Sequence, residues 1–482
     1  MAIQKPTLPK GTRDFGPADV QKRKYILNTI ETVFKKYGFM PLETPTMENL
    51  STLEGKYGDE GDKLLFRILD SGDFLKTLKE YNDKMLADES ADATFLPSYT
   101  GKLNDLDSKA TTKFIAEKGL RYDLTVPFAR YVVMHRNDIT FPFRRYQMQP
   151  VWRADRPQKG RYREFWQCDA DVVGSDSLLN ELDLIQIYDE AFKALGITQY
   201  QIKLNNRKVL AGIAEVVKSI DVMNNIAVAI DKLDKIGEEG VRKELTEQGF
   251  SESELNTLFD IITIKGENKE ILNQLKDKLQ SSSEGLKGIE ELSFILKNIE
   301  TINQASNQTI NLSLDFSLAR GLSYYTGGIF EVVSNQGTLK SSIGGGGRYD
   351  NLTGIFGLPN VSGVGISFGL DRIYDVMDEL KLFPEQLRAT STQVLFCHFD
   401  EATQLYCLPA LKVLRDAGIA AEVYPDNKKL SKQLDYANAL QIPFAAIAGE
   451  TEMQQQVFTL KNLVSGEQKT CSINELVSLV KQ

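Results

Sequence analysis

The strongest constraint on the fold is that two regions of strand-like sequence are separated by a long helical one. Apolar and polar residues alternate, as in β-strands, over residues 120–173 and again over 309–371. Residues 208–304, between them, are rich in Lys and Glu and follow the helical period. We therefore expect a β-rich core whose halves are far apart in the sequence, with the helical block as a self-contained insertion.

Shorter regions flank this core. A helix is expected over residues 19–36, after which Pro41 and Pro45 favour a short extended segment. Residues 70–118 are polar and irregular, which predicts a surface insertion, part helix and part loop. From Gln393 to the end, short apolar runs alternate with helical sequence, the pattern of a small α/β domain. A chain of 482 residues is too long for one ordinary core, so several domains are expected.

Composition limits the compartment and the partners. No apolar run of about 18 residues is present, and the N-terminus lacks the apolar core of a signal peptide, so a cytosolic protein is expected. The cysteines lack the paired spacing of a zinc site and are expected to be ordinary buried thiols; they are Cys168, Cys397, Cys407 and Cys471. A net charge of −9 argues against coating of nucleic acid through one basic field, so any RNA partner must be held by local basic patches.

The run RYDLTVP is the first to carry candidate binding groups. If it is a strand, Arg121, Asp123 and Thr125 share one face and the residues between them share the other. A carboxylate and a hydroxyl two residues apart can both accept hydrogen bonds from an ammonium group. On this run alone, the preferred interpretation is the solvated outer face of a half-buried strand.

Residues 143–174 predict two long strands joined by a basic loop. The side chains that share one face of the first strand are Arg145, Gln147, Gln149 and Arg153, and those that share a face of the second are Gln167, Asp169 and Asp171. A hairpin with one strongly polar face covers something polar, although a solvated charged hairpin is an equal alternative. The loop cations are Arg153, Arg156, Lys159, Arg161 and Arg163, which suit a polyphosphate or an RNA end.

The run LDFSLARGLSYYTGG combines an arginine, a glycine turn and two tyrosines. Arg320 can neutralise charge that develops on a phosphate, and the hydroxyl of Tyr324 or Tyr325 can bond a ring nitrogen of a substrate. The alternative is a tight connection between strands with core tyrosines.

A glycine-rich region follows. Glycines at 344–347 lie within strand-like sequence, which predicts close approach of the backbone to a ligand or to another strand. The run GVGISFGLDRI then predicts a strand that leads into a helix, with Arg372 near the helix start, where the helix dipole also favours a phosphate. No P-loop or Rossmann glycine pattern is present. Neither His135 nor His398 belongs to these clusters; both are interpreted as structural, and no metal site is expected.

These runs, in this order, resemble the class II histidyl-tRNA synthetases over nearly the whole chain. PKGTRDF together with Pro45 is similar to the first class motif, whose helix and strand form the dimer interface. The hairpin at 143–174 is similar to the second motif, and GISFGLDRI to the third. More specific are three runs peculiar to the histidine enzymes, RYDLTVPFAR, RPQKGRYREFWQCDAD and ARGLSYYTGG.

The resemblance implies roles for particular residues. The histidine α-amino group would be held by Asp123, Thr125 and Gln167, and the imidazole by Asp171 and Tyr325, with Tyr324 beside them. ATP would be held by Arg153, Arg320 and Arg372; of these, Arg153 and Arg320 are the expected catalytic residues, and Arg320 would lie between the histidine carboxylate and the α-phosphate. The acceptor end of the tRNA would meet Arg156, Pro157 and Gln158.

The implied fold is α+β: the class II antiparallel sheet flanked by helices, a helical insertion and a C-terminal α/β anticodon-binding domain. Expected boundaries are 1–205 for the first part of the catalytic core (with an insertion at about 74–116), 206–305 for the helical insertion, 306–386 for the second part of the core and 390–482 for the anticodon-binding domain. Implied ligands and partners are L-histidine, ATP with Mg²⁺, tRNA(His) and a second copy of the chain.

The chain departs from the family pattern at three places. Ser323 stands where many relatives have aspartate, which puts the support of Arg320 in doubt. Asp171 is the shorter of the two acids that the family uses, which predicts an imidazole pocket like that of the archaeal and eukaryotic branch. The insertion at about 74–116 has no recognised counterpart.

Two other functions are compatible with a core of this kind. The regulatory subunit of ATP phosphoribosyltransferase shares this core but lacks an anticodon domain and needs no intact ATP-binding arginines, whereas Arg153, Arg320 and Arg372 are all present here. An RNA-binding sensor derived from a synthetase is the third possibility. Pyrophosphate exchange that depends on histidine separates the three.

Overall fold

The computed structural model describes residues 5–55, 62–76, 79–80, 108–319, 324–338, 341–385 and 387–481. The chain forms two compact units, one of Met1–Arg13 and Ile26–Leu382 and one of Asp14–Tyr25 and Phe383–Gln482. Arg320 and Ser323 lie outside the described residues, and so does most of the insertion at 74–116.

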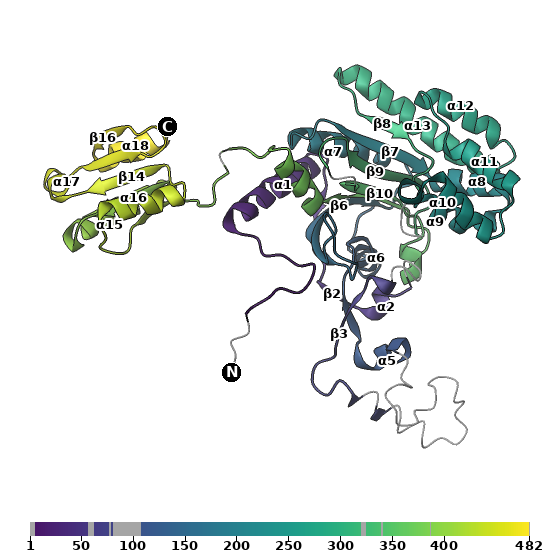
Figure 1. Cartoon of the computed structure of the whole chain (residues 1–482), viewed down its shortest axis with the longest axis horizontal. Coiled ribbons are helices and arrows are strands. Elements are labelled where there is room, and N and C mark those ends of the chain that lie inside the picture. The colour runs from purple at the N-terminus through teal and green to yellow at the C-terminus, as the bar shows by residue number, and fades with distance from the viewer. Residues whose placement is uncertain are drawn as a thin grey trace. The chain divides into compact units, whose positions relative to one another are not determined.

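The first unit is built on an eight-stranded sheet in the order β1-β5-β6-β11-β10-β9-β7-β8. Figure 1 labels β6, β7, β8, β9 and β10 of this sheet. Its strands are β1 (Met40–Pro41), β5 (Phe143–Trp152), β6 (Glu164–Val173), β7 (Tyr200–Asn206), β8 (Leu312–Leu314), β9 (Gly328–Ser334), β10 (Gly344–Arg348) and β11 (Gly363–Gly369). All pairs are antiparallel except β1 with β5 and β7 with β8. Because β6 pairs directly with β11, the two halves of the core do join in one sheet, as the sequence predicts.

One face of this sheet is apolar and is covered by α7 (Leu179–Ala194) and by the part of α1 (Pro17–Lys36) from Ile26 onward, which belongs to the same unit. Phe368 of β11 lies at the centre of the aromatic contacts on this face. Its ring centroid is 5.8 Å from that of Phe34 in α1, 4.8 Å from that of Tyr188 in α7 and 5.3 Å from that of Phe192 in α7. Each of these four aromatic side chains is fully buried. The opposite face carries the polar strand residues Arg145, Gln147, Asp169, Asp171 and Ser367, and the site described below lies on it.

The segment after residue 120 differs from the prediction. It was expected to continue as a strand, but β4 (Lys118–Leu120) ends there and helix α6 (Thr125–Met134) begins at Thr125. Asp123 Oδ1 accepts a hydrogen bond from the Val126 N–H at 3.2 Å, as an N-terminal cap does. Pro127 falls in the first helical turn, where its missing N–H needs no partner. The predicted alternation is therefore wrong here, and Arg121 and Asp123 are buried rather than solvated.

A small sheet of order β2-β4-β3 stands beside α6 and joins β4 to β2 (Met47–Asn49) and β3 (Phe66–Ile68). The short helices nearby are α2 (Leu50–Leu53) and α5 (Ser108–Ile115), and α14 (Leu370–Glu379) follows β11 directly, with η3 (Thr353–Phe356) between β10 and β11. The prediction of a glycine-rich strand that leads into a helix carrying Arg372 is confirmed.

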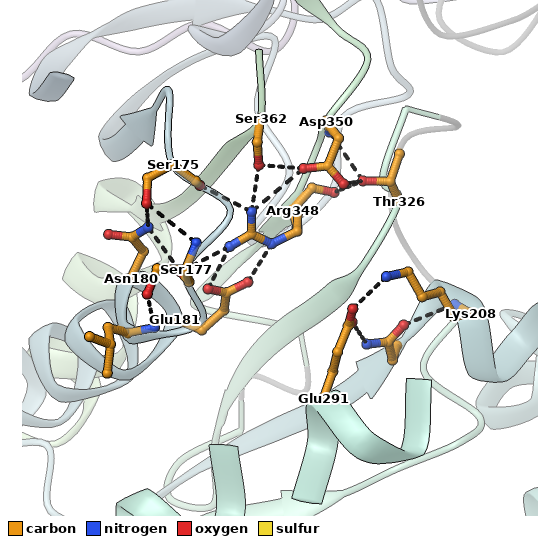
Figure 2. A network of polar contacts seen from close by, with 12 residues as sticks. Ser175, Ser177, Asn180, Glu181, Lys208, Glu291, Thr326, Arg348, Asp350 and Ser362 are labelled. Carbon is orange, nitrogen blue, oxygen red and sulfur yellow. Dashed lines mark hydrogen bonds and ion pairs between the residues drawn. The ribbon is translucent and has the colours of Figure 1, made fainter. Parts of the chain in front are cut away.

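The helical block is also confirmed. Its helices are α8 (Arg207–Val217), η2 (Ile220–Val222), α9 (Met223–Ile230), α10 (Leu233–Glu247), α11 (Glu252–Ile262), α12 (Asn268–Lys278) and α13 (Ser283–Ser306). Helix α13 packs on α8, and it also contacts β7 and β9 (Figure 1). Glu291 of α13 pairs with Lys208 and accepts from Asn206 Nδ2 at 2.6 Å, which ties the block to the end of β7 (Figure 2).

The second unit has the α/β pattern that the sequence predicts. Its five-stranded sheet, in the order β13-β12-β14-β15-β16, consists of β12 (Val394–His398), β13 (Ala421–Val423), β14 (Phe444–Ala448), β15 (Phe458–Asn462) and β16 (Gln468–Cys471). Its helices are α15 (Glu401–Asp416), α16 (Leu430–Ala439), α17 (Glu450–Gln455) and α18 (Ile473–Lys481). Two apolar clusters fill the unit, so it has a core of its own. All four cysteines of the chain are buried free thiols, as expected.

Candidate active site

A cavity of about 310 Å³ opens on the polar face of the large sheet. Eight of the residues selected from the sequence line it: Asp123, Thr125, Arg153, Gln167, Asp171, Tyr324, Tyr325 and Arg372. They come from the start of α6 and the turn before it, the residue after β5, strand β6, the segment before β9 and the start of α14. His135 and His398 are not among the lining residues.

The polar face of the hairpin is buried, not solvated. The register pairs Arg145 with Asp171 and Gln147 with Asp169, so all four side chains share one face, as predicted. None is more than 2% exposed. Charges and amides buried to this extent need partners. The solvated charged hairpin is therefore ruled out.

Asp171 is fixed by its neighbours. Its Oδ2 lies 2.8 Å from Nη2 of Arg145, and its Oδ1 accepts a hydrogen bond from the hydroxyl of Tyr349. Burial raises the pKa of Asp171, while Arg145 and Tyr349 lower it and so stabilise the charged form. Gly365 faces the same carboxylate, and a Cβ added there would lie 1.9 Å from Asp171 Oδ1. The room for this carboxylate thus depends on a glycine in β11.

Three further acceptor atoms line the cavity and have no hydrogen-bond partner among the described residues. They are Asp123 Oδ2, Gln167 Oε1 and Asp169 Oδ1. Burial raises the pKa of Asp123 to about 7 and that of Asp169 to about 7, against a usual value of 3.8. Unsatisfied buried acceptors are costly, and a cationic donor with several N–H groups would satisfy them together.

Two arginines present guanidinium groups to the same cavity. Arg153 Nε donates to the carbonyl of Tyr122 at 3.0 Å, and its guanidinium lies 5.2 Å from the ring centre of Phe165. Arg372, in the first turn of α14, donates from Nε to Gly160 O at 2.9 Å and from Nη1 to Ser342 O at 2.7 Å. Two arginines and a helix N-terminus together favour a phosphate group.

The two tyrosines form one wall. The rings of Tyr324 and Tyr325 have centroids 4.8 Å apart, and Thr125 is a hydrogen-bond partner of Tyr324. Tyr325 packs on Gly347, where a Cβ would come within 2.9 Å of the tyrosine ring. The acids, the tyrosines and two of the three arginines assigned to ATP, Arg153 and Arg372, therefore meet in one cavity.

Comparison with known proteins agrees with this arrangement. A family model described as histidyl-tRNA synthetase matches residues 80–373, and one described as an anticodon-binding domain matches 392–482. Histidine--tRNA ligase of Christiangramia forsetii is 54% identical over 478 residues, which is 99% of this chain and 100% of the relative. The chain belongs to the histidyl-tRNA synthetase family. It is thus an aminoacyl-tRNA synthetase, an ATP-dependent ligase.

Other relatives extend the comparison. Histidine--tRNA ligase of Cytophaga hutchinsonii is 55% identical over 98% of this chain and 99% of the relative. A crystal structure of histidyl-tRNA synthetase from a Nostoc species superposes with a TM-score of 0.79 at 29% identity, covering 99% of each chain. A Bacillus halodurans structure described as an ATP phosphoribosyltransferase regulatory subunit/histidyl-tRNA synthetase shares the fold at a TM-score of 0.68 and 18% identity, over 93% of this chain and 99% of that one.

The synthetase residues expected to meet tRNA lie outside the cavity. Arg156 and Gln158 are exposed in the loop between β5 and β6, which the backbone closes through Gln158 and Arg161. Pro157 contacts Gly11 of the N-terminal segment, where a Cβ would lie 2.8 Å from its ring. A shallow recess beside the loop is lined by Gly11, Thr12, Arg13, Pro157, Gln158, Lys159, Arg161 and Tyr162.

Sequence reasoning missed residues that act through contacts between distant segments. Arg13 pairs with Asp371 and lies 3.3 Å from the ring centre of Tyr162, so the N-terminal segment braces the loop and the start of α14. Arg145 and Tyr349, which fix Asp171, were not selected as site residues either. A signal was available for Arg145, because it alternates with the other polar residues of its strand.

Proposed function

We propose that this chain activates L-histidine with ATP, forming histidyl adenylate and pyrophosphate, and then transfers the histidyl group to the 3′ end of tRNA(His). The observation that carries the proposal is the single cavity that joins buried acceptors to the arginines Arg153 and Arg372. Histidine offers an ammonium group and a ring N–H to acceptors, and ATP offers phosphates to arginines. Family membership supports the same reaction.

For histidine, we assign the α-amino group to Asp123, Thr125 and Gln167. The unsatisfied oxygens of Asp123 and Gln167 support this assignment. We assign the imidazole to Asp171 and Tyr325, with Tyr324 beside them. A carboxylate has about four acceptor positions, so Asp171 can accept an imidazole N–H while it keeps Arg145 and Tyr349.

For ATP, we assign Arg153, Arg320 and Arg372, with Arg153 and Arg320 as catalytic residues. The histidine carboxylate attacks the α-phosphate in line, and pyrophosphate leaves. Protein groups do little covalent work in such a transfer, so orientation and charge stabilisation dominate. Mg²⁺ arrives with ATP as part of the substrate, and among the described residues no three His, Cys, Asp or Glu side chains group as metal ligands. The position of Arg320 is outside the described residues.

For tRNA, we assign the acceptor end to Arg156, Pro157 and Gln158, and the anticodon to the second unit. The exposure of Arg156 and Gln158 supports the first assignment, and the family match over 392–482 supports the second. We further propose a cytoplasmic homodimer. No described helix is long and apolar enough to cross a membrane.

The same proposal divides the chain by role. The catalytic core comprises 1–205, with its insertion at about 74–116, and 306–386. The helical insertion is 206–305 and the anticodon-binding domain is 390–482. The inserted position of the helices between β7 and β8 supports this division.

The test is exchange of labelled pyrophosphate into ATP. We expect exchange that depends on histidine and on Mg²⁺ in the absence of tRNA, followed by transfer of labelled histidine to tRNA(His). Arg372→Ala is the matched variant and should lower the exchange rate on the order of 10²-fold, since one cation at a transferring phosphoryl group is removed. Absence of histidine-dependent exchange in the unchanged chain would leave a regulatory or sensor role in its place.

A further inference from the structure

The segment 324–327 brings both tyrosines into the cavity, and a polar cluster lies directly behind it. We call this the Arg348 cluster; its members are Ser175, Ser177, Glu181, Thr326, Arg348, Asp350 and Ser362 (Figure 2). Only Thr326 belongs to the segment that carries the tyrosines. None of these seven residues lines the cavity, so the cluster can act on the reaction only through residues that do.

The inner end of the cluster is a buried ion pair. Arg348 Nε and Nη2 donate to Glu181 Oε1 and Oε2 at 2.6 and 2.7 Å, a bidentate arrangement. Glu181 is 0% exposed and Arg348 is 4% exposed. Glu181 belongs to α7, which packs on the apolar face of the sheet, so the pair gives Arg348 a rigid anchor.

At the outer end of the cluster, a chain of hydrogen bonds connects Arg348 to Thr326. Arg348 Nη1 donates to Ser362 Oγ at 2.6 Å, and Ser362 Oγ donates in turn to Asp350 Oδ1. Asp350 Oδ2 then accepts from the hydroxyl of Thr326 at 2.6 Å, while the Asp350 N–H donates to that hydroxyl at 3.1 Å. Thr326 thus both donates and accepts within the cluster (Figure 2).

The backbone of the segment is held at the same place. The N–H of Thr326 donates to Arg348 O at 2.8 Å, and Gly327 O accepts from the N–H of Arg207 at 2.8 Å. Since Tyr325 immediately precedes Thr326 and its ring packs on Gly347, a shift of Thr326 moves that ring within the cavity.

We propose that Thr326 is a positioning residue for histidine recognition. Its hydroxyl, held by Asp350 and anchored through Arg348 and Glu181, keeps Tyr324 and Tyr325 in the orientation that contacts the amino acid. This inference rests on the proposed function, because it takes the cavity to be the histidine site. On the ATP side of the cavity, Arg153 donates to Tyr122 O and Arg372 donates to Gly160 O and Ser342 O, hydrogen bonds in which Thr326 takes no part.

The experiment compares Thr326→Val with Thr326→Ser in pyrophosphate exchange. Valine keeps the shape and removes the hydroxyl, whereas serine keeps the hydroxyl. We expect Thr326→Val to raise the KM for histidine on the order of tenfold, because Asp350 loses its donor and the segment loses its anchor. The KM of Thr326→Val for ATP should change by less than about twofold. Thr326→Ser, which keeps the hydroxyl, should have a KM for histidine near the wild-type value.

Thr353→Val is the matched control. Its hydroxyl is buried and donates to Val361 O at 3.5 Å, whereas that of Thr326 is partly buried, and Thr353 is not part of the Arg348 cluster. This variant should show a change in thermal stability without a change in the KM for histidine. If Thr326→Val fails to fold, Thr326→Ala provides the same comparison with a smaller side chain.

The outcomes separate the two proposals. A lowered melting temperature with an unchanged KM for histidine in Thr326→Val would make Thr326 merely structural and overturn the inference, and so would equal increases in both KM values. Absence of histidine-dependent exchange in the wild-type chain would refute the proposed function itself, and this inference with it.

Discussion

At the scale of single residues, the site is defined by carboxyl groups that are buried beside one another. The pKa of Asp123 and of Asp169 is raised to about 7 because burial disfavours the charged form. Near neutral pH each of these groups is therefore partly protonated. An ammonium group bound beside them favours the charged form, so binding of the amino acid and loss of a proton are coupled.

The first prediction is that histidine binding at about pH 6.5 releases a proton from Asp123. Since the pKa of the empty site is about 7, part of the population is protonated there and must ionise to pair with the ammonium group. Histidine affinity should accordingly rise with pH towards a plateau above about pH 8. Calorimetry in two buffers of different ionisation enthalpy measures the released protons.

Asp123→Asn serves as the control for this experiment. Histidine loses a proton from its own imidazole near the same pH, and that contribution persists in the variant. The difference in proton release between the two proteins belongs to Asp123. Identical proton release would show that Asp123 is already ionised in the empty site or does not contact the amino acid.

The same shift has a consequence for stability. Asp123 has a pKa of about 7 when folded and about 3.8 when unfolded, so between these values the folded chain binds more protons. The free energy of unfolding therefore falls as the pH rises from about 3.8 to about 7, because the unfolded chain ionises this carboxyl group first. On the proposed assignment, bound histidine offsets this loss by pairing with the carboxylate.

The second prediction concerns Asp171→Asn. We expect it to weaken histidine selection, measured as an increased KM for histidine in exchange, more than it weakens ATP binding, because an amide can present the wrong group to the imidazole N–H. The structure adds a cost in stability, since Arg145 is 0% exposed and loses its charged partner. That cost is on the order of 3–5 kcal/mol. An unchanged KM for histidine in a folded variant would contradict the assignment.

At the scale of elements, the paired strands β10 and β11 carry glycines where side chains from other segments, or the neighbouring strand, come close to the backbone. A Cβ at Gly363 would come within 2.3 Å of the ring of Tyr349, and one at Gly347 within 2.9 Å of Tyr325. Between the strands, a Cβ at Gly346 would lie 2.1 Å from Gly365 O. The glycines at 344–347 are thus part of a closely packed strand and do not form a linker.

The third prediction uses two glycines of this strand pair. Gly365→Ala places a methyl group against Asp171, so it should raise the KM for histidine and destabilise the fold by ~1–3 kcal/mol, because the carboxylate and its partners must move. Gly345→Ala is the matched control, since its Cβ would meet only Phe330 O at 3.4 Å. Chemical denaturation measures the free energy of unfolding of both variants, and pyrophosphate exchange measures their KM for histidine. Equal free energies of unfolding would show that Asp171 has room to move.

The sequence predicted these elements unevenly. The hairpin and the β11–α14 junction were predicted well, because alternation and glycine placement are read within one run. Helix α6 was missed. The hydrogen bond from the Val126 N–H to Asp123 and the proline at Pro127 in the first turn favour the helix, and they outweighed an alternation that lasts only a few residues. The contacts Arg13–Asp371 and Glu181–Arg348 could not be predicted, because each joins segments far apart in the chain and no local pattern records them.

At the scale of the whole molecule, the substrate-binding residues are separate in sequence from the larger, C-terminal segment of the second unit, Phe383–Gln482. Every residue assigned to histidine or ATP precedes residue 373, and the second unit from Phe383 onward has its own apolar core. Because the net charge is −9, tRNA must be held by local groups of cations and not by the field of the whole chain. Removal of one such group should therefore weaken tRNA binding without a general effect on the chemistry.

The last prediction concerns a chain that ends at Glu385. It keeps Phe383, whose ring centroid lies 6.5 Å from that of Tyr25, so helix α1 retains this partner. The truncated chain should still exchange pyrophosphate in a histidine-dependent way, with KM values for histidine and ATP close to those of the intact chain. It should aminoacylate tRNA poorly, mostly through a raised KM for tRNA, since remote contacts contribute binding more than chemistry. Its tRNA affinity should also fall less steeply with salt than that of the intact chain, because fewer phosphates are contacted. Equal KM values for tRNA and equal salt slopes would contradict an anticodon-reading role for the second unit and leave it a role in regulation or dimerisation.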